Sequence, residues 1–219
     1  MRDEFEEKWE KMQIANWKGD EEKIVTFFKR FDLDIRDVFK QITGIDYKRM
    51  QTVCYLLSKI DKAIKICDFL DTLERNSLED VDIIKIYILT SHAEIASRSL
   101  CGKETKLDLV RRFFKPVESN LENRIIMADI SLDRTLDMNF AYILYKIRCE
   151  YTHEGNYIGR IFKRNEDGAS SLLFCFKDDS KKLCGICGIT YQEFLKIYMR
   201  ALIENIKVYC DYTPPIVAE

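Results

Sequence analysis

Glycine, proline and histidine are scarce in this sequence. Its 219 residues include 8 glycines, 3 prolines and 2 histidines, and so few turn residues exclude a many-stranded sandwich or barrel. An excess of charge is also lacking, because 35 Lys and Arg face 37 Asp and Glu. This balance excludes the global basic surface of an extended nucleic-acid binder, and the 47% apolar share excludes a disordered chain. We expect a compact, all-α protein.

Long apolar runs and a secretory signal are missing as well. The first ten residues are rich in acidic side chains, and no apolar run approaches the roughly 20 residues of a membrane span. The 8 cysteines are spread through helical patterns, which favours free thiols in a reducing compartment. We therefore predict a cytoplasmic protein that does not contact a membrane.

Apolar residues recur with helical spacing along most of the chain. The clearest helix is expected between residues 46 and 73, with its core face on Met50, Val53, Leu57, Ile60, Ile64 and Cys67. A second long helix is expected between residues 77 and 101, with its core face on Val81, Ile84, Ile88, Ile95 and Leu100. The short connection between them predicts an antiparallel pair of long helices. Shorter helices are expected within 3–17, 20–31, 34–42, 102–116, 121–130 and 137–155.

The pattern changes after residue 155. Segments 157–162 and 170–176 are rich in β-forming residues and flank a turn-rich stretch, which predicts one small β-hairpin near residues 157–176. Thr190 and Glu193 then form a capping-box pattern at the start of the last helix. We expect residues 1–44 to be an N-terminal helical extension, 45–212 a helical domain with the hairpin inserted, and 213–219 a tail.

The two histidines are the scarcest groups that react near neutral pH. His92 lies in the middle of an expected helix, next to Ile88, Leu89 and Ile95 at helical spacing. Such a place is typical of a structural histidine with a satisfied hydrogen bond. His153 instead lies at an expected helix end, just before Gly155.

Arg148 precedes His153 by five positions. On an ideal helix this spacing leaves them about 140° apart around the axis and about 7.5 Å apart along it. An unwinding last turn, or a second copy related by a two-fold axis, could bring guanidinium and imidazole to one phosphate. Arginine is a permanent forked anion clamp and histidine a proton donor or acceptor near pH 7, which suits metal-free phosphodiester cleavage.

The Arg148-X4-His153 pattern, with Ile-Leu-Tyr-Lys-Ile before it and Glu-Gly after it, resembles the HEPN family of helical bundles. The resemblance covers about residues 45–212 in architecture and 145–157 in motif. It implies a metal-independent endoribonuclease that acts as a homodimer, with the motifs of both subunits in one cleft. It also implies a role in toxin–antitoxin systems or antiviral defence, with an antitoxin or regulatory protein as a possible partner.

If the chain is such an enzyme, His153 acts as general base or acid and Arg148 stabilises the charge on the phosphorane, giving a 2′,3′-cyclic phosphate. Glu150 and Glu154 lie close enough in sequence to raise the pKa of His153 or to hold its tautomer. An aromatic ring such as Tyr157 could stack on a base. Four cations near the motif are candidate RNA-binding residues: Lys146, Arg160, Lys163 and Arg164.

A structural interpretation stands beside the catalytic one. Arg148 would pair with Glu150 or another carboxylate at the surface, and His153 would cap the helix through the dipole. The chain would then be a non-catalytic helical module that binds RNA, a nucleotide or a protein.

A third, weaker interpretation is a zinc-stabilised regulator. Cys184 and Cys187 have the spacing of half a zinc knuckle, but a tetrahedral site needs two more ligands and no second CxxC or HxxxH exists. An apolar turn leading into the last helix is the favoured interpretation of this segment. No Gly-rich phosphate loop or paired-carboxylate motif stands out, so we predict no metal and no cofactor.

Overall fold

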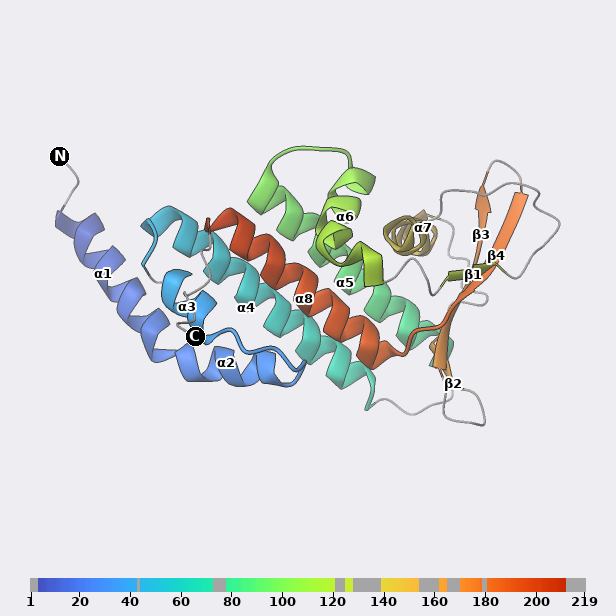
Figure 1. The fold of residues 1–219 in the computed structure, drawn as a ribbon, viewed down its shortest axis with the longest axis horizontal. Helices are drawn as coiled ribbons and strands as arrows, with labels where there is room; N and C mark the ends of the chain where they lie inside the picture. The colour runs from blue at the N-terminus through green and yellow to red at the C-terminus, as the bar shows by residue number, and fades with distance from the viewer. Residues whose placement is uncertain are drawn as a thin grey trace, which may run out of the picture.

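The computed structural model describes residues 4–42, 44–72, 78–120, 125–127, 139–153, 162–164, 170–178 and 181–211. Within these ranges, side chains are described everywhere except at 78–80, 120, 125–127, 153, 163–164, 170–178 and 181–186. Helices make up most of what is described, as expected (Figure 1). The helices are α1 (Glu4–Gly19), α2 (Glu21–Lys29), α3 (Arg36–Ile42), α4 (Tyr47–Leu70), α5 (Leu78–Cys101), α6 (Lys106–Phe114), the 3₁₀ helix η2 (Lys115–Asn120), α7 (Phe140–His153) and α8 (Tyr191–Tyr209). The strands are β1 (Ile125–Met127), β2 (Phe162–Arg164), β3 (Ser170–Asp178) and β4 (Lys181–Cys187).

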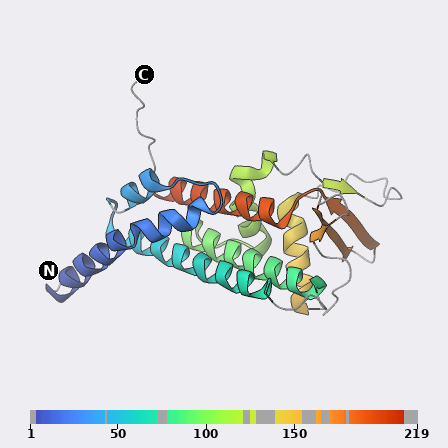
Figure 2. The same cartoon turned by 90° about the horizontal axis from the view of Figure 1, so that it is seen from below.

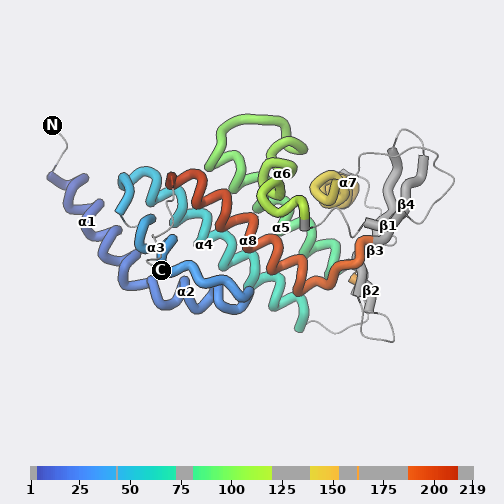
Figure 3. Tube along the Cα trace, viewed as in Figure 1, coloured from blue at the N-terminus to red at the C-terminus, as the bar shows by residue number. Residues whose placement is uncertain are grey.

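Three long helices, α4, α5 and α8, form the body of the molecule. α4 and α5 run in opposite directions, as the short connection between them predicted, and α8 lies beside α5 (Figures 1 and 2). The sheet lies at one end of this body and α1 at the other (Figure 1). The Cα trace shows α7 beside α6 (Figure 3), and α7 also contacts β3. In the part of the chain that the structure describes, every helix is too short or too polar to cross a lipid bilayer.

The expected core face of α4 is confirmed. Its six predicted positions are all buried, and Val53, Ile60 and Ile64 have no exposed surface. The helix begins at its N-cap Asp46, whose carboxylate accepts a hydrogen bond from the backbone N–H of Arg49 at 3.1 Å. A single apolar stripe therefore describes α4 well.

The expected core face of α5 is wrong in most positions. Ile95 is 44% exposed, and Ile84, Ile88 and Leu100 are only partly buried. The apolar residues that are buried instead are Val81, Ile83, Ile86, Leu89, Ala93 and Ala96. The reason is that α4, α6, α7 and α8 all contact α5, so neighbours cover it on several sides and no single stripe defines its core face.

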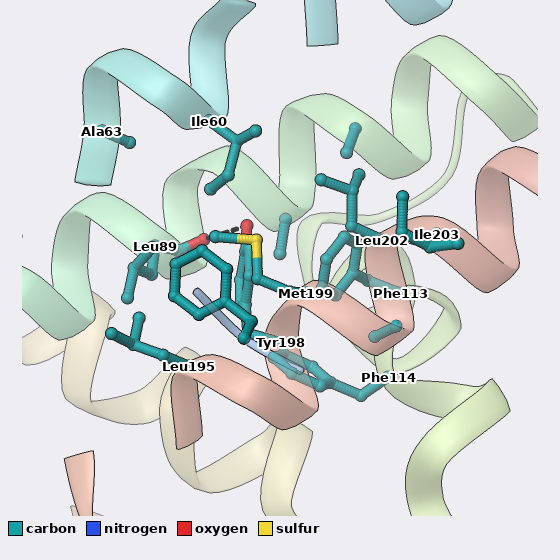
Figure 4. Packing of buried hydrophobic residues seen from close by; sticks show 14 of the residues in the cluster. Ile60, Ala63, Leu89, Phe113, Phe114, Leu195, Tyr198, Met199, Leu202 and Ile203 are labelled. Carbon is teal, nitrogen blue, oxygen red and sulfur yellow. Dashed lines mark hydrogen bonds between the residues drawn. The ribbon is translucent and has the colours of Figure 1, made fainter. Parts of the chain in front are cut away.

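Tyr198 of α8 is the largest fully buried side chain of the core. Its ring lies 4.8 Å from that of Phe113, centroid to centroid, and Leu89, Leu195 and Met199 surround it (Figure 4). The same buried cluster includes residues of α2 and α3, such as Phe28 and Val38. The division of the chain at residue 44 stays a prediction.

The β part is larger than the expected hairpin insertion. β2 pairs antiparallel with β3, from Phe162 opposite Leu172 to Arg164 opposite Ser170. β3 begins where the second segment was predicted, whereas β2 includes Arg164, which was predicted as part of the turn, and residues 157–161 lie outside the described residues. Two further strands complete an antiparallel sheet of order β1-β4-β3-β2. The helix predicted over 121–130 is therefore wrong at β1, and the turn predicted at Cys184–Cys187 is wrong because it lies in β4. Both strands find their partners far away in the sequence, which a local pattern does not reveal.

The start of α8 is as predicted. Thr190 Oγ1 accepts from the N–H of Glu193 at 3.0 Å, and the Thr190 N–H donates to Glu193 Oε2 at 2.9 Å. This capping box fixes where the strand β4 ends and the last helix begins.

Candidate functional site

Arg148 lies where α7 crosses α5. α7 is seen end-on in Figure 1, where α5 runs across the page, so the two helices meet at a steep angle. The Arg148 side chain is only 12% exposed, and its Nε lies 3.2 Å from Oε1 of Glu94 in α5, which is 8% exposed. The structural interpretation expected a surface ion pair with a carboxylate such as Glu150. The pair is instead buried, and it joins two helices.

The charges of three cations act on the Glu94 carboxylate. Burial raises the pKa of Glu94, and the positive charges of Arg148, Lys106 and Arg98 lower it, with burial the larger effect. The three cations come from α7, α6 and α5. The Glu94 carboxylate therefore interacts with positive charges on three helices, and cations of this kind also suit an anion such as phosphate.

Hydrogen-bonding capacity is left over at this ion pair. Among the described atoms, Arg148 Nε and Glu94 Oε1 have no partner with hydrogen-bond geometry although they are in ionic contact. The buried hydroxyl of Ser91, one turn before Glu94 on α5, also has none. Unsatisfied buried polar groups are costly, so they are typical of sites that bind a further group.

Tyr145 and Cys149 extend the polar cluster along α7. The pKa of the Tyr145 hydroxyl is raised to about 12, chiefly by a hydrogen bond with Cys149 and by burial. The Glu94 carboxylate contributes to this increase and Arg148 opposes it. One turn on, the ring of Tyr151 lies 5.1 Å from that of Tyr87 of α5. The face of α7 that meets α5 is thus polar at Arg148 and aromatic on either side of it.

His153 is the last residue of α7. The helix continues to it, and Thr152 Oγ1 donates to the backbone oxygen of Arg148 at 2.8 Å. Of the two ways in which Arg148 and His153 could meet, an unwound last turn is therefore not the one seen up to His153. Helical geometry therefore places Arg148 and His153 about 140° apart around the axis of α7. The side chain of His153 lies outside the described part of the structure.

The other predicted site residues are distributed unevenly. Glu150 is 6% exposed within α7, two positions from Arg148 and therefore on another side of the helix. Lys146 places its Nζ 5.4 Å from the ring centre of Tyr142. Lys163 and Arg164 belong to β2, opposite Ser171 and Ser170 of β3. Glu154, Tyr157 and Arg160 lie outside the described residues.

Glu94 is the site residue that sequence reasoning missed. It stands near the middle of an apolar helix, two residues after His92, where a carboxylate is rarely buried without a partner. A carboxylate in such a position was the signal that could have pointed to Glu94. Its partner Arg148 lies 54 positions further along the chain, and only the fold brings the two residues together.

His92 is a structural histidine, as predicted. Its Nδ1 lies 2.7 Å from the hydroxyl of Tyr198 and its Nε2 3.4 Å from the backbone oxygen of Leu56. Burial lowers the pKa of His92 to about 4, and the hydrogen bond to Leu56 opposes this effect. The neutral ring holds α4, α5 and α8 together.

A second buried polar cluster centres on Lys85 of α5. The Lys85 side chain is 4% exposed and pairs with Asp71, the C-cap of α4, and with Asp82 Oδ1 at 3.2 Å. Its Nζ also lies 4.4 Å from the ring centre of Tyr191 at the start of α8. Asp82 Oδ2 accepts from the backbone N–H of Phe162 in β2 at 3.1 Å. Lys85 and Asp82 therefore attach the sheet to the helical body.

The segment that carries Cys184 and Cys187 is part of strand β4, between residues 181 and 187. Across the described ranges, no group of three or more His, Cys, Asp or Glu side chains is arranged to hold a metal ion.

Comparison of the chain with protein-family models, with curated proteins and with solved structures gave no match. Any function must therefore be argued from the site itself.

Proposed function

We propose that the protein is a metal-independent endoribonuclease of HEPN type with a HEPN-like helical bundle. The observation that carries this proposal is the junction of α5, α6 and α7, where Arg148 is held by Glu94 with Arg98 and Lys106 close by. Positive charge and leftover hydrogen-bonding capacity in a mostly buried site suit a phosphodiester group. The motif Arg148-X4-His153 supplies both the anion clamp and the acid–base group.

The proposed step is transesterification within the RNA strand. The ribose 2′-oxygen attacks the neighbouring phosphorus, its proton passes to a base, and the bond from phosphorus to the 5′-oxygen breaks as that oxygen is protonated. His153 accepts or donates the proton, and Arg148 neutralises the extra charge on the phosphorane. Glu94 is a positioning residue, because its ionic contact with Nε fixes the direction of the Arg148 guanidinium.

Two subunits would be needed for one complete site. Because α7 is helical through His153, Arg148 and His153 project from different sides of the same helix, about 140° apart. A two-fold axis close to α7 would bring Arg148 of one subunit towards His153 of the other. The proposal therefore includes a homodimer with RNA as its substrate.

The RNA would approach over a positively charged surface around this junction. Lys103, Lys106 and Lys115 lie on or beside α6, and Lys146, Arg160, Lys163 and Arg164 remain candidates for phosphate contacts. Arg111 and Arg112 are less suited, because they are paired with Asp108 and Glu104. A role in toxin–antitoxin systems or antiviral defence belongs to the same proposal, with an antitoxin or regulatory protein as partner.

The test is cleavage of a labelled single strand of RNA in EDTA by wild type, Arg148→Ala, His153→Ala and Glu94→Gln proteins. We expect the cleavage rate to fall at least about a thousandfold in Arg148→Ala and His153→Ala, and to fall less in Glu94→Gln. Arg112→Ala is the matched control, since it removes an exposed arginine of α6 that is also paired with a glutamate, Glu104. Cleavage that survives both Arg148→Ala and His153→Ala would refute the enzyme.

A non-catalytic helical module that binds RNA, a nucleotide or a protein is the second candidate. The burial of the Arg148–Glu94 pair favours it, because a buried pair that joins two helices also serves stability. In this case Arg148→Ala and Glu94→Ala each lower the free energy of unfolding, and the double variant lowers it by less than the sum of the two single changes. The wild-type protein is then expected to leave RNA intact. Native mass adds a second readout, because the enzyme requires a dimer and the module does not.

A further inference from the structure

One side of α4 faces solvent along nearly the whole helix, which lies along an edge of the helical body (Figure 2). Seven positions on this side follow one another at alternating spacings of four and three residues. They stay within about 100° around the axis and extend over about 32 Å. Six of them are exposed and Thr52 is partly buried. The seven residues, which we name the α4 outer face, are Lys48, Thr52, Tyr55, Lys59, Lys62, Ile66 and Phe69.

Large apolar side chains of the α4 outer face are open to solvent. Tyr55, Ile66 and Phe69 are 50%, 49% and 61% exposed. The core face of α4 lies on the other side of the helix, so these three residues contribute little to the packing of the bundle. Exposed apolar side chains that gather on one face are typical of a surface that another molecule covers.

The charges of the α4 outer face have one sign. Its charged residues are Lys48, Lys59 and Lys62, and in the part of the chain that the structure describes none of them is in ionic contact with a carboxylate. Arg49 and Lys65, on other sides of the same helix, are paired with aspartates. The α4 outer face is therefore positive although the chain has a net charge of −2, and it attracts an acidic partner.

A groove of about 570 Å³ borders the α4 outer face. Tyr55 and Ser58 line it from α4, and Trp17 and Phe27 line it from α1 and α2. Trp17 and Phe27 pack against the core but are only partly buried. Because Tyr55 belongs to both surfaces, a molecule that covers the outer face also reaches the groove.

The groove itself is electrically balanced. Its charged residues form two ion pairs, Asp20 with Lys23 at 2.7 Å and Asp61 with Lys65 at 2.6 Å. It therefore suits an apolar side chain of a partner, while the lysines of the outer face suit carboxylates beside that side chain.

The arrangement favours a polypeptide helix over RNA or a membrane. Lys59 places its Nζ 5.1 Å from the ring centre of Tyr55, which covers one face of a ring on which a base could stack, and Ile66 offers no ring at all. Helices that lie on membranes carry apolar residues and lysines on opposite faces, whereas both alternate along one face of α4. An amphipathic helix laid along α4 matches the length and the alternation of this surface.

A second copy of this chain fits the surface less well. A two-fold axis through the α4 outer face would bring Lys59 and Lys62 of one copy towards the same lysines of the other. Like charges in such an interface repel each other. The charge pattern therefore requires a partner of opposite sign.

We propose that the α4 outer face and the groove beside it bind an acidic amphipathic helix of a partner protein. Carboxylates of this helix pair with Lys59 and Lys62. Its apolar residues cover Ile66 and Phe69, and one apolar side chain enters the groove beside Trp17. The interaction is independent of RNA cleavage and holds whether or not the chain is an enzyme.

The test uses a helical peptide of about 20 residues, matched to the length of the outer face, with leucine and glutamate alternating along one side. Its control is the same peptide with glutamine in place of every glutamate, which keeps the shape and removes the charge. In a Trp9→Phe background Trp17 is the single tryptophan, and its fluorescence reports on the groove. We expect a saturable change with the glutamate peptide and at least about tenfold weaker binding of the glutamine peptide.

Matched charge variants locate the effect. Lys59→Gln with Lys62→Gln removes two charges from the α4 outer face. Lys196→Gln with Arg200→Gln removes two exposed charges from α8, along the opposite edge of the body (Figure 2). Calorimetry is expected to show at least about fivefold weaker binding for the first pair and less than about twofold for the second.

Apolar variants test the other half of the surface. Ile66→Ala with Phe69→Ala is expected to weaken binding at least about tenfold. Val208→Ala, which truncates a side chain of α8 that is 75% exposed, is expected to leave binding unchanged. Thermal unfolding of the double variant is expected to resemble that of the wild type, because both side chains are exposed. A loss of binding is then not a loss of fold.

Several results would overturn the proposal. No saturable binding of the glutamate peptide, or equal binding of both peptides, would refute an acidic partner. Equal losses for the two charge variants would mean that only the overall charge of the protein matters. A Trp17 response to single-stranded RNA or to phosphatidylserine vesicles in place of the peptide would assign the surface to another class of partner. Self-association that Phe69→Ala abolishes would assign it to a second copy of this chain.

Discussion

The helices α4 and α5 have the same length, 24 residues each, and lie side by side, yet they bury different kinds of side chain. The buried residues of α4 are all apolar. α5 instead buries Lys85, Thr90, His92, Glu94 and Ser97 together with its apolar residues. An outer helix needs one apolar face, whereas a central helix is covered on several sides and must supply partners for its buried polar groups. The candidate chemistry of this protein therefore lies on α5 and its contacts.

The largest expected effect separates two isoleucines that the sequence treats as equivalent. Ile60 of α4 has no exposed surface, and Ile95 of α5 is 44% exposed. Ile60→Ala is expected to lower the free energy of unfolding by about 3–4 kcal/mol, because it leaves a cavity in the core. Ile95→Ala is expected to cost less than about 1 kcal/mol. Urea unfolding monitored by circular dichroism measures both, and equal losses would show that α5 is oriented as the sequence predicted.

The next comparison uses one lysine from each helix. Lys85→Met in α5 leaves Asp82 without its buried partner and is expected to cost about 3 kcal/mol. Lys65→Met in α4 removes an exposed pair with Asp61 and is expected to cost about 0.5 kcal/mol or less. Thermal unfolding of the two variants at low ionic strength tests this difference. The prediction would be contradicted if 1 M NaCl removed the loss of stability in Lys85→Met, because salt screens buried ion pairs only slightly.

A pH titration sharpens the contrast at His92. Burial lowers the pKa of His92 to about 4 from the ordinary value near 6.5, so the unfolded chain binds the proton first as the pH falls. The contribution of His92 to the free energy of unfolding is present above pH 6.5 and is lost as the pH falls from 6.5 to 4. Between pH 7 and 5.5 we expect about 1 kcal/mol less stability.

The control for this titration is His92→Gln. It removes the titrating group, so its stability is expected to change less over the same pH window, whatever its absolute value. The other histidine and the carboxyl groups are common to both proteins. Parallel pH profiles for wild type and variant would contradict a buried neutral imidazole.

The smallest effect concerns reactivity and leaves stability unchanged. Burial raises the pKa of the α4 thiols, that of Cys67 to about 11, whereas Cys101 at the end of α5 is exposed. We expect a maleimide to label Cys101 rapidly in the native protein and to label Cys54 and Cys67 only after unfolding. Mass spectrometry of labelled wild type and Cys101→Ser protein measures this. Rapid labelling of Cys67 in native protein would mean that α4 opens locally.

Sequence patterns predicted the parts of the fold that depend on local chemistry. The apolar stripe of α4, the capping box at Thr190 and the structural role of His92 follow from spacing and neighbours along the chain. The strands β1 and β4 did not follow, because their backbone partners lie far away in sequence. Short apolar runs such as Ile125–Met127 suit a helix or a strand equally well.

The candidate site was also predicted only in part. Arg148 and His153 are recognisable by their spacing, and the end of α7 falls where a glycine follows. Glu94 was not identified, because nothing local to Arg148 points to a residue on another helix. Which face of α5 meets α7 is decided by the packing of four neighbouring helices, and that packing is a property of the whole chain.

The pairing of β1 with β4 has a consequence for the order of folding. Residues 125–127 and 185–187 are adjacent in space, so the chain between them, including α7, forms a closed loop of about sixty residues. Closing a loop of this length is entropically costly, and contacts so distant in sequence form late. On the ribosome, the pairing of β1 with β4 cannot form until β4 has emerged. The helices before residue 120 can therefore assemble during synthesis, while the segment that carries Arg148 and His153 reaches its final position only after β4 has been synthesised.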